Sequence, residues 1–205
     1  MRRFMILMAV VAFLGVAGTA EADIVINEAM VDPDAVSDTT GEWVELFNSG
    51  DTAVDIDGWT IKDADSNSHL IDNGGSLLIP AYGFLVLGRS AVFAENGGYV
   101  PDYVYSCFQL SNTIDEIILE NSSVEIDRVD YSGSWPVNAG RSLAYTGSGD
   151  NNVLDNWFCT PQTSEYIFGA GDYASPGQPN VIPEPSSLLL WLSGLLFLSF
   201  RKQKH

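Results

Sequence analysis

Basic residues and histidine are scarce in this chain, and their scarcity excludes several functions. The 205 residues include 9 lysines and arginines and 2 histidines against 27 aspartates and glutamates. Residues 23–180 hold only 4 of the bases but 25 of the acids, a net charge of −21. Such a charge repels phosphate backbones, so we do not expect nucleic-acid binding. It favours cation binding, contact with basic surfaces, or simply solubility.

Motifs of hydrolytic and metal-dependent enzymes are missing as well. The chain contains neither Gly-x-Ser-x-Gly nor His-Glu-x-x-His. Histidine is the usual general base near neutral pH, and residues 23–180 contain only His69, which we expect at the surface in a turn. Carboxylates are too abundant for their presence to identify a catalytic pair. We therefore predict a protein that is not an enzyme, with a hydrolase that uses carboxylates as the alternative.

Cysteine is limited to Cys107 and Cys159, both in the part of the chain that we expect to be exported. An oxidising compartment makes one disulfide between them plausible, and two free thiols are the alternative. Neither cysteine has a Cys-x-x-Cys partner or a nearby histidine, so metal binding by this pair is not expected.

Helical periodicity is nearly absent, and short apolar runs alternate with Gly, Asn, Asp and Pro instead. This pattern is typical of a β-sandwich or barrel. We expect one all-β domain over residues 23–180, with Trp43, Trp59, Phe84 and Trp135 supplying much of the apolar core. The strands are expected at 23–30, 42–48, within 54–62, 70–72, 76–79, 84–88, 114–120, 124–131 and 141–145.

The first 22 residues have the layout of a secretory signal peptide. Arg2 and Arg3 precede an apolar run over residues 4–16, and Ala20 and Ala22 stand three and one positions before the expected cut. The arginines would stay on the cytoplasmic side while the apolar helix enters the membrane. We expect export and cleavage by signal peptidase after Ala22, with an uncleaved N-terminal anchor as the alternative.

The last 25 residues carry a second pattern of the same kind in reverse order. Pro183-Glu184-Pro185 precedes an uncharged, leucine-rich run over 186–200, and three basic residues follow. At about 1.5 Å per residue this run reaches roughly 22 Å, against a hydrocarbon core of about 30 Å. We expect a single short transmembrane helix that spans only with snorkelling or local thinning. A weak anchor suits a segment that is later removed.

Residues 181–205 resemble the PEP-CTERM sorting signal, since all three of its parts occur in order. The resemblance implies that Pro183, Glu184 and Pro185 are recognised by a membrane enzyme of the exosortase type, which cuts nearby. It also implies a Gram-negative cell that makes exopolysaccharide. We expect a protein anchored in the membrane at first and then held at the cell surface or in the extracellular matrix, with an ordinary C-terminal anchor as the alternative.

Several segments between the two ends resemble the lamin-tail domain. These are Ile-Asn-Glu at 26–28, Gly-Glu-Trp-Val-Glu-Leu-Phe-Asn at 41–48, and the segments 56–61, 78–88, 110–119, 127–131 and 174–180, the last reading Ala-Ser-Pro-Gly-Gln-Pro-Asn. The resemblance implies an immunoglobulin-like β-sandwich. It also implies an accessory module without chemistry of its own, used for adhesion or for binding polysaccharide, protein or a divalent cation. A purely structural spacer is a further alternative.

Two acidic loops are candidates for a calcium site, because hard cations prefer clustered oxygen ligands on loops. The second loop begins like an EF-hand but lacks its later glycine and its closing glutamate, and a solvated acidic turn is the alternative. Glu28 and Glu45 fall inside expected strands, where an unpaired buried carboxylate is costly, so we expect them to have a structural role. The calcium candidates are Asp32, Asp34, Asp38, Asp55, Asp57, Asp63, Asp65 and Asn67.

Overall fold

The structure is a computed structural model that describes residues 24–180 and 182. The expected signal peptide with Ala20 and Ala22, the Pro183-Glu184-Pro185 motif and the expected transmembrane helix therefore lie outside the described residues. In the described part of the chain, no helix combines the length and the apolar character needed to cross a membrane.

Short strands make up nearly all the regular structure of the described residues. The helices are α1 (Asp38–Gly41) and the 3₁₀ turn η1 (Leu154–Asn156). The strands are β1 (Ile24–Met30), β2 (Trp43–Asn48), β3 (Val54–Asp55), β4 (Thr60–Lys62), β5 (Ser68–Leu70), β6 (Leu78–Ile79), β7 (Phe84–Gly88), β8 (Tyr103–Val104), β9 (Asp115–Asn121), β10 (Val124–Tyr131), β11 (Leu143–Tyr145), β12 (Trp157–Cys159), β13 (Ile167–Phe168) and β14 (Asp172–Tyr173).

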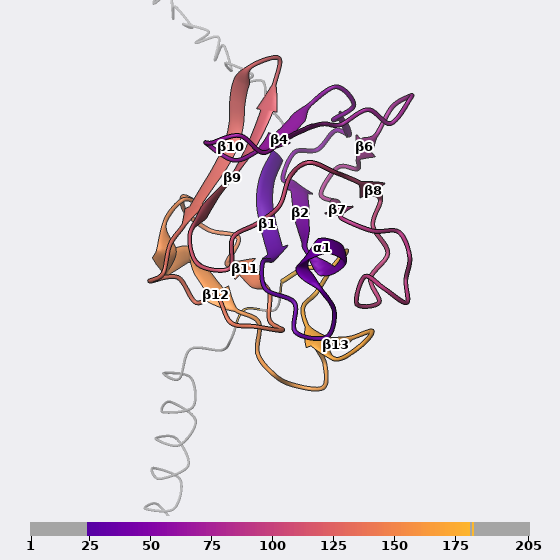
Figure 1. Cartoon of the computed structure of the whole chain (residues 1–205). Coiled ribbons are helices and arrows are strands. Elements are labelled where there is room, and N and C mark those ends of the chain that lie inside the picture. Colours follow the sequence, from indigo (N-terminus) through magenta and orange to yellow (C-terminus); the bar gives the residue numbers. More distant parts are fainter. Residues whose placement is uncertain (1–23, 181, 183–205) are drawn as a thin grey trace, which may run out of the picture.

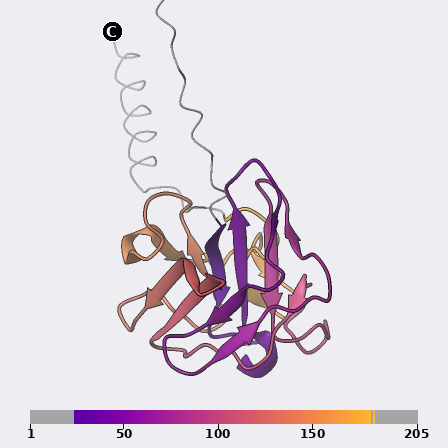
Figure 2. The ribbon, with the colours of Figure 1, turned by 90° about the horizontal axis from the view of Figure 1, so that it is seen from above.

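Two larger sheets form the body of the fold (Figures 1 and 2). One has six strands in the order β12-β11-β1-β2-β7-β8, and the other has four in the order β10-β9-β4-β5. All their pairings are antiparallel except that of β7 with β8. The pairs β13–β14 and β3–β6 form two small additional sheets. The expected all-β class is therefore confirmed.

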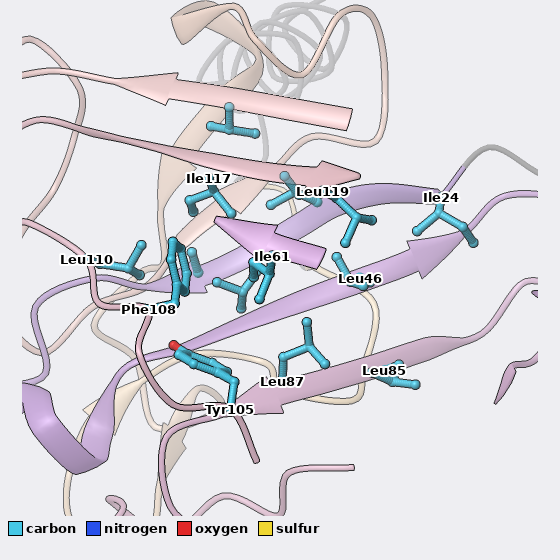
Figure 3. Close-up of a cluster of buried hydrophobic side chains, with 14 of the residues drawn as sticks. Ile24, Leu46, Ile61, Leu85, Leu87, Tyr105, Phe108, Leu110, Ile117 and Leu119 are labelled. Atoms are coloured by element: carbon cyan, nitrogen blue, oxygen red, sulfur yellow. The ribbon is translucent and has the colours of Figure 1, made fainter. Parts of the chain in front are cut away.

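The main core lies between the two larger sheets. Ile24, Leu46 and Leu87 come from the six-stranded sheet, while Ile61 and Leu119 come from the four-stranded sheet, and all are buried in one cluster. Figure 3 shows these side chains between the ribbons, with Tyr105, Phe108 and Leu110 of the loop after β8 at one end. Alternation along each strand explains the arrangement, because every second side chain faces the opposite sheet.

A second, smaller core covers the other face of the six-stranded sheet, here called the outer face. It comprises Met30, Trp43, Val86, Tyr99 and Ala174, with Phe168 packed against it. This result corrects the expected position of Trp43, which lies in this cluster and not between the sheets. Phe84 is also outside the main core, where it is half-buried and packs on Phe47 with ring centroids 4.9 Å apart. Trp59 and Trp135 lie in the main core as expected.

A β-bulge in β1 places Glu28 on the outer face. Ile24 and Ile26 face the main core, and strict alternation would send Glu28 there too. The register with β2 shifts between Ile26 and Glu28, so Glu28 lies opposite Glu45 instead. One inserted residue reverses the facing of every later side chain, which is why Ala29 belongs to the main core and Met30 to the outer one.

Most expected strands agree with the structure within a few residues. β1, β2, β7, β10 and β11 fall inside their expected ranges, and β9 is displaced by one residue. The expected strand at 70–72 lies two residues earlier, as β5. Five strands had not been expected, namely β3, β8, β12, β13 and β14, and the one strand expected within 54–62 is β4.

Candidate functional site

Two buried carboxylates occupy neighbouring positions on the outer face. Glu28 in β1 and Glu45 in β2 are paired across the strands, and both side chains are 0 % exposed. Glu45 accepts a hydrogen bond from Asn27 Nδ2 at 2.8 Å, and Glu28 accepts one from Ser142 Oγ at 2.5 Å. Their expected structural role takes the form of bonded acceptors, since no cation of residues 24–180 lies within ion-pair distance of either.

The segment over residues 174–180, here called the closing segment, is bound by this carboxylate pair. The backbone N–H of Ser175 donates to Glu28 Oε1 at 3.0 Å, and the Ser175 hydroxyl donates to Glu28 Oε2 at 2.9 Å. The backbone N–H of Gly177 donates to Glu45 Oε2 at 2.5 Å. Each carboxylate therefore joins the sheet to one end of the same short turn.

The local sequence of the closing segment favours that turn. Gln178 N–H donates to the carbonyl of Ser175 at 2.9 Å, with Pro176 and Gly177 between them and Gly177 at φ +78°. A turn with proline first and a positive φ second is the type that favours Pro-Gly. Asn180 then ends the segment, donating from Nδ2 to the carbonyls of Asn27 at 2.8 Å and Tyr145 at 2.9 Å.

The environment of the pair favours the protonated form of both acids. Burial raises the pKa of Glu28 to about 7, although hydrogen bonds from Ser142 and Ser175 oppose the shift. Burial also raises the pKa of Glu45 to about 8, and the negative charges of Glu28 and Asp102 add to the effect. Two adjacent carboxylates sealed from water resist carrying charge together.

A cavity of about 470 Å³ lies beside the closing segment. Its walls are residues 98–100 of the loop between β7 and β8, residues 165–168, which include β13, and residues 174–176, 178 and 179 of the closing segment. Aliphatic, aromatic and proline residues make up most of the lining, while Glu165 is the one charged residue in it. A volume of several hundred cubic ångströms with few polar groups is typical of small-ligand sites.

Glycines hold two walls of the cavity together. Gly98, at φ +94°, lies so close to residue 169 that an added Cβ would come within 2.3 Å of Gly169 Cα. A Cβ on Gly169 would collide with the carbonyl oxygen of Gly97. The N–H of Ala170 also donates to that carbonyl at 3.0 Å. The loop and the β13–β14 hairpin therefore meet backbone to backbone, which requires glycine on both sides.

The eight calcium candidates do not form one site. Asn112 Nδ2 donates to Asp32 Oδ1 and Asp38 Oδ2, at 2.9 and 3.2 Å, so these two acids do lie near each other. The backbone N–H of Asp34 donates a hydrogen bond to Asp172 Oδ1. Across residues 24–180 and 182, no group of three or more His, Cys, Asp or Glu side chains is placed to hold a metal ion. The calcium prediction finds no support in this arrangement.

The other candidates take part mainly in hydrogen bonds to backbone N–H groups of their own or neighbouring loops. Asp55 Oδ1 accepts from the N–H of Asp57 and of Leu77, and Asp57 Oδ1 accepts from the N–H of Asn73. In the loop after β4, Asp63 Oδ1 accepts from the N–H of Asp65 and of Asn67, and Asp63 Oδ2 from Asn67 Nδ2. Carboxylates that bond to N–H groups two to four residues along the chain are typical of turns.

Both cysteines are free thiols, which corrects the expected disulfide between Cys107 and Cys159. Cys159 lies in β12, at one edge of the six-stranded sheet, whereas Cys107 follows β8 at the opposite edge. Five strand spacings of about 4.8 Å separate these edges, and a disulfide needs Cα atoms within about 7 Å. The carbonyl of Cys107 accepts from the N–H of Ser68 in β5.

His69 is half-buried, which corrects its expected position at the surface. Its Nε2 lies 2.9 Å from the hydroxyl of Tyr103, and its Nδ1 accepts from the N–H of Ser106 at 3.2 Å. Burial lowers the pKa of the imidazole. His69 therefore joins β5 to the segment around β8, a structural role.

Comparison with known families agrees with this architecture. The two packed sheets define an all-β sandwich, and the family model for the Lamin Tail Domain matches residues 17–133, more than half of the chain. The chain belongs to this family. No curated protein matches the chain. The family match ends before β11, so the closing segment and the β13–β14 hairpin lie beyond it.

Sequence reasoning identified parts of this site but not the site as a whole. It singled out Glu28, Glu45 and the closing segment separately, without any indication that they touch. Contacts such as that between Glu28 and Ser175 span 147 residues of sequence, and no local pattern reveals them. The cavity walls at 98–100 and 165–168 were not expected to have a role.

Proposed function

We propose that this protein is exported, sorted through its C-terminal tail, and kept at the cell surface or in the extracellular matrix as a non-enzymatic binding module. The observation that carries the binding role is the cavity of about 470 Å³ beside the closing segment. The signal-peptide pattern at residues 1–22 and the Pro-Glu-Pro tail support export and sorting. Signal peptidase and an exosortase-like enzyme are the implied processing partners.

The lining of the cavity favours an uncharged sugar residue of an extracellular polysaccharide as the ligand. Val100, Ile167 and Phe168 offer apolar surface, and Gln178 and Glu165 offer hydrogen-bonding groups. A sugar ring has the matching combination of apolar C–H faces and hydroxyl groups. No lysine, arginine or histidine lines the cavity, which disfavours anionic ligands. The apolar lining equally disfavours a bare metal ion, since such ions require clustered oxygens.

An enzymatic role for the buried acid pair is disfavoured by its position. Glu28 and Glu45 have the raised pKa values that a general acid needs, to about 7 and about 8. A general acid must also come within hydrogen-bond reach of its substrate. Neither glutamate lines the cavity, and the oxygens of both are bonded to protein groups. The pair is better explained as the attachment point of the closing segment.

The binding role can be tested by titrating the protein with the polysaccharide secreted by the cells that make it. Val100 and Ile167 line the cavity and are 76 % and 49 % exposed, so Val100→Ser and Ile167→Ser should leave the fold intact. We expect each to weaken binding about threefold to tenfold, because each removes apolar contact area. Val124→Ser is the matched control, since Val124 is 62 % exposed in β10 and lies away from the cavity.

Equal affinity in the unaltered chain and the three variants would mean that the polysaccharide binds outside this cavity. No binding at all would favour a structural spacer. Binding of a surface protein in place of the polysaccharide, lost in the same two variants, would retain the site and change the ligand.

Sorting can be tested separately by intact-mass measurement of the protein recovered from culture. The proposal expects a species that begins at Asp23 and lacks the apolar tail. A secreted form that retains residues 186–205 would contradict processing of the tail.

A further inference from the structure

The cavity and the buried acid pair share one structural element, the closing segment. Ser175 lines the cavity, while its N–H and its hydroxyl bind Glu28. Pro176 and Gln178 also line the cavity, while Gly177 between them binds Glu45. Two carboxyl groups and the amide of Asn180 hold this wall of the cavity to the sheet. Any change in those groups therefore reaches the cavity directly.

We propose that Glu28 and Glu45 form a proton-controlled clasp that closes the cavity wall when the pair holds at least one proton and releases it when both carboxylates are charged. The proposal rests on the proposed function only in regarding the cavity as a ligand site. The movement of the closing segment is a property of the fold and can be measured without any ligand.

The surroundings of the pair explain why two charges would open the clasp. Glu28 lies opposite Glu45 on the neighbouring strand. Its hydrogen bonds come from Ser142 and Ser175, which are both uncharged. Glu45 is bonded to Asn27 and Gly177 and feels the negative charges of Glu28 and Asp102. Two adjacent anions in a dry site repel each other strongly and lack the water that would stabilise them. Lifting the closing segment would admit that water.

The direction of the pH effect follows from linkage. The pKa values of both acids are raised by burial in the closed state, to about 7 and about 8, from 4.5 when solvated. The closed state therefore binds protons more tightly than the open state. Its advantage is complete below about pH 4.5 and is lost as the pH rises through 7 and 8. The clasp is thus closed in mildly acidic surroundings and loosens in alkaline ones.

Hydrogen exchange of the full-length chain in a neutral detergent tests the clasp. The amides of Ser175 and Gly177 report the closing segment, and those of β9 and β10, in the other sheet, report global unfolding. After correction for the intrinsic effect of pH on exchange, protection of the two reporter amides should fall at least about tenfold between pH 6 and pH 9. Protection in β9 and β10 should fall less.

A neutral variant of one acid gives the matched comparison. Glu45→Gln keeps the size of the side chain and can still accept from the N–H of Gly177, so protection of Ser175 and Gly177 should fall much less with pH than in the unaltered chain, because only Glu28 still titrates. Asp127→Asn is the control. Asp127 is another acid whose pKa burial raises, to about 6, but its bonds run to Ile26 N–H and Asn151 Nδ2, away from the closing segment.

Protection of Ser175 and Gly177 that stays constant from pH 6 to pH 9 in the unaltered chain would overturn the clasp, whether or not the variants fold. An equal response in Glu45→Gln and Asp127→Asn would also overturn it. If the amides respond as expected but the polysaccharide never binds, the clasp stands and the proposed ligand site fails. If binding occurs but does not change with pH, the site stands and its control by the clasp fails.

Discussion

The burial of individual carboxylates is the feature of this fold that is hardest to predict from the sequence. Among the described residues, Glu28, Glu42, Glu45, Asp63 and Asp172 are buried carboxylates, and nothing in the local sequence of Glu42, Asp63 or Asp172 separated them from the solvated majority. Glu28 and Glu45 were noted because they fall in expected strands. The bulge that turns Glu28 outward depends on pairing with β2, so alternation alone would have placed it in the main core.

One buried ion pair makes a prediction about stability. Arg89 Nη1 lies 3.0 Å from Glu42 Oε2, with side-chain exposures of 15 % and 2 %. Glu42 Oε2 also accepts from the N–H of Leu110 at 3.1 Å. Removing one member of a buried ion pair leaves the other charge buried without a partner. Arg89→Met should therefore lower the free energy of unfolding by about 3 kcal/mol.

Urea unfolding at pH 7.5 would measure this loss. The matched control is Lys62→Met, because Lys62 pairs with Glu120 at 2.7 Å in a more exposed position. Exposed pairs contribute about 0–1 kcal/mol, so its effect should be small. Similar losses in both variants would show that burial of the Glu42 carboxylate has no special role.

At the scale of single elements, the sequence was most informative where strands are long and alternate regularly. β9 and β10 were expected almost to the residue, as was their connection through Asn121, Ser122 and Ser123. β8, β12, β13 and β14 have only two or three residues each, too few to show a period. Those short elements exist because of tertiary contacts, and two of the cavity walls depend on them.

The hairpin between β9 and β10 offers a prediction about turn chemistry. Ser122 and Ser123 both have positive φ, at 51° and 67°, a conformation that disfavours serine and that two-residue turns usually fill with Asn-Gly. Replacing the pair by Ser122→Asn together with Ser123→Gly should raise the free energy of unfolding by about 1 kcal/mol.

Thermal unfolding of the double variant would test this gain. Ser164→Gly is the control, because Ser164 is exposed and is not among the residues with positive φ. We expect no gain there, since added backbone freedom favours the unfolded chain. A double variant no more stable than the parent would contradict the assigned turn.

At the scale of the whole molecule, the spacing of short apolar runs predicted the all-β class, composition showed the acidic character, and the family resemblance led to the correct family. Composition could not indicate how the charges are distributed. Lys62, Arg89 and Arg128 are already paired with carboxylates, and the guanidinium of Arg141 donates to the carbonyls of Cys159 and Thr160. Most carboxylates of the described residues therefore lack a neutralising cation.

This excess of negative charge predicts how the protein responds to salt. Self-repulsion destabilises a compact polyanion, and screening relieves it, so sodium chloride should raise the melting temperature. Because the candidate ligands are dispersed over separate loops, calcium and magnesium at equal concentration should raise it by similar amounts. Scanning calorimetry in the three salts would measure these shifts. A much larger rise of the melting temperature with calcium than with magnesium would contradict this prediction and support a specific calcium site.

The proposed ligand site lies on the outer face of the six-stranded sheet, beside the closing segment. Chemical-shift mapping of the ¹⁵N-labelled chain, titrated at pH 6 with the secreted polysaccharide, tests that claim most directly. We expect chemical-shift changes concentrated at residues 98–100, 165–168 and 174–180, with little change in β5, β9 and β10. Shifts confined to the four-stranded sheet, or no shifts at all, would contradict it.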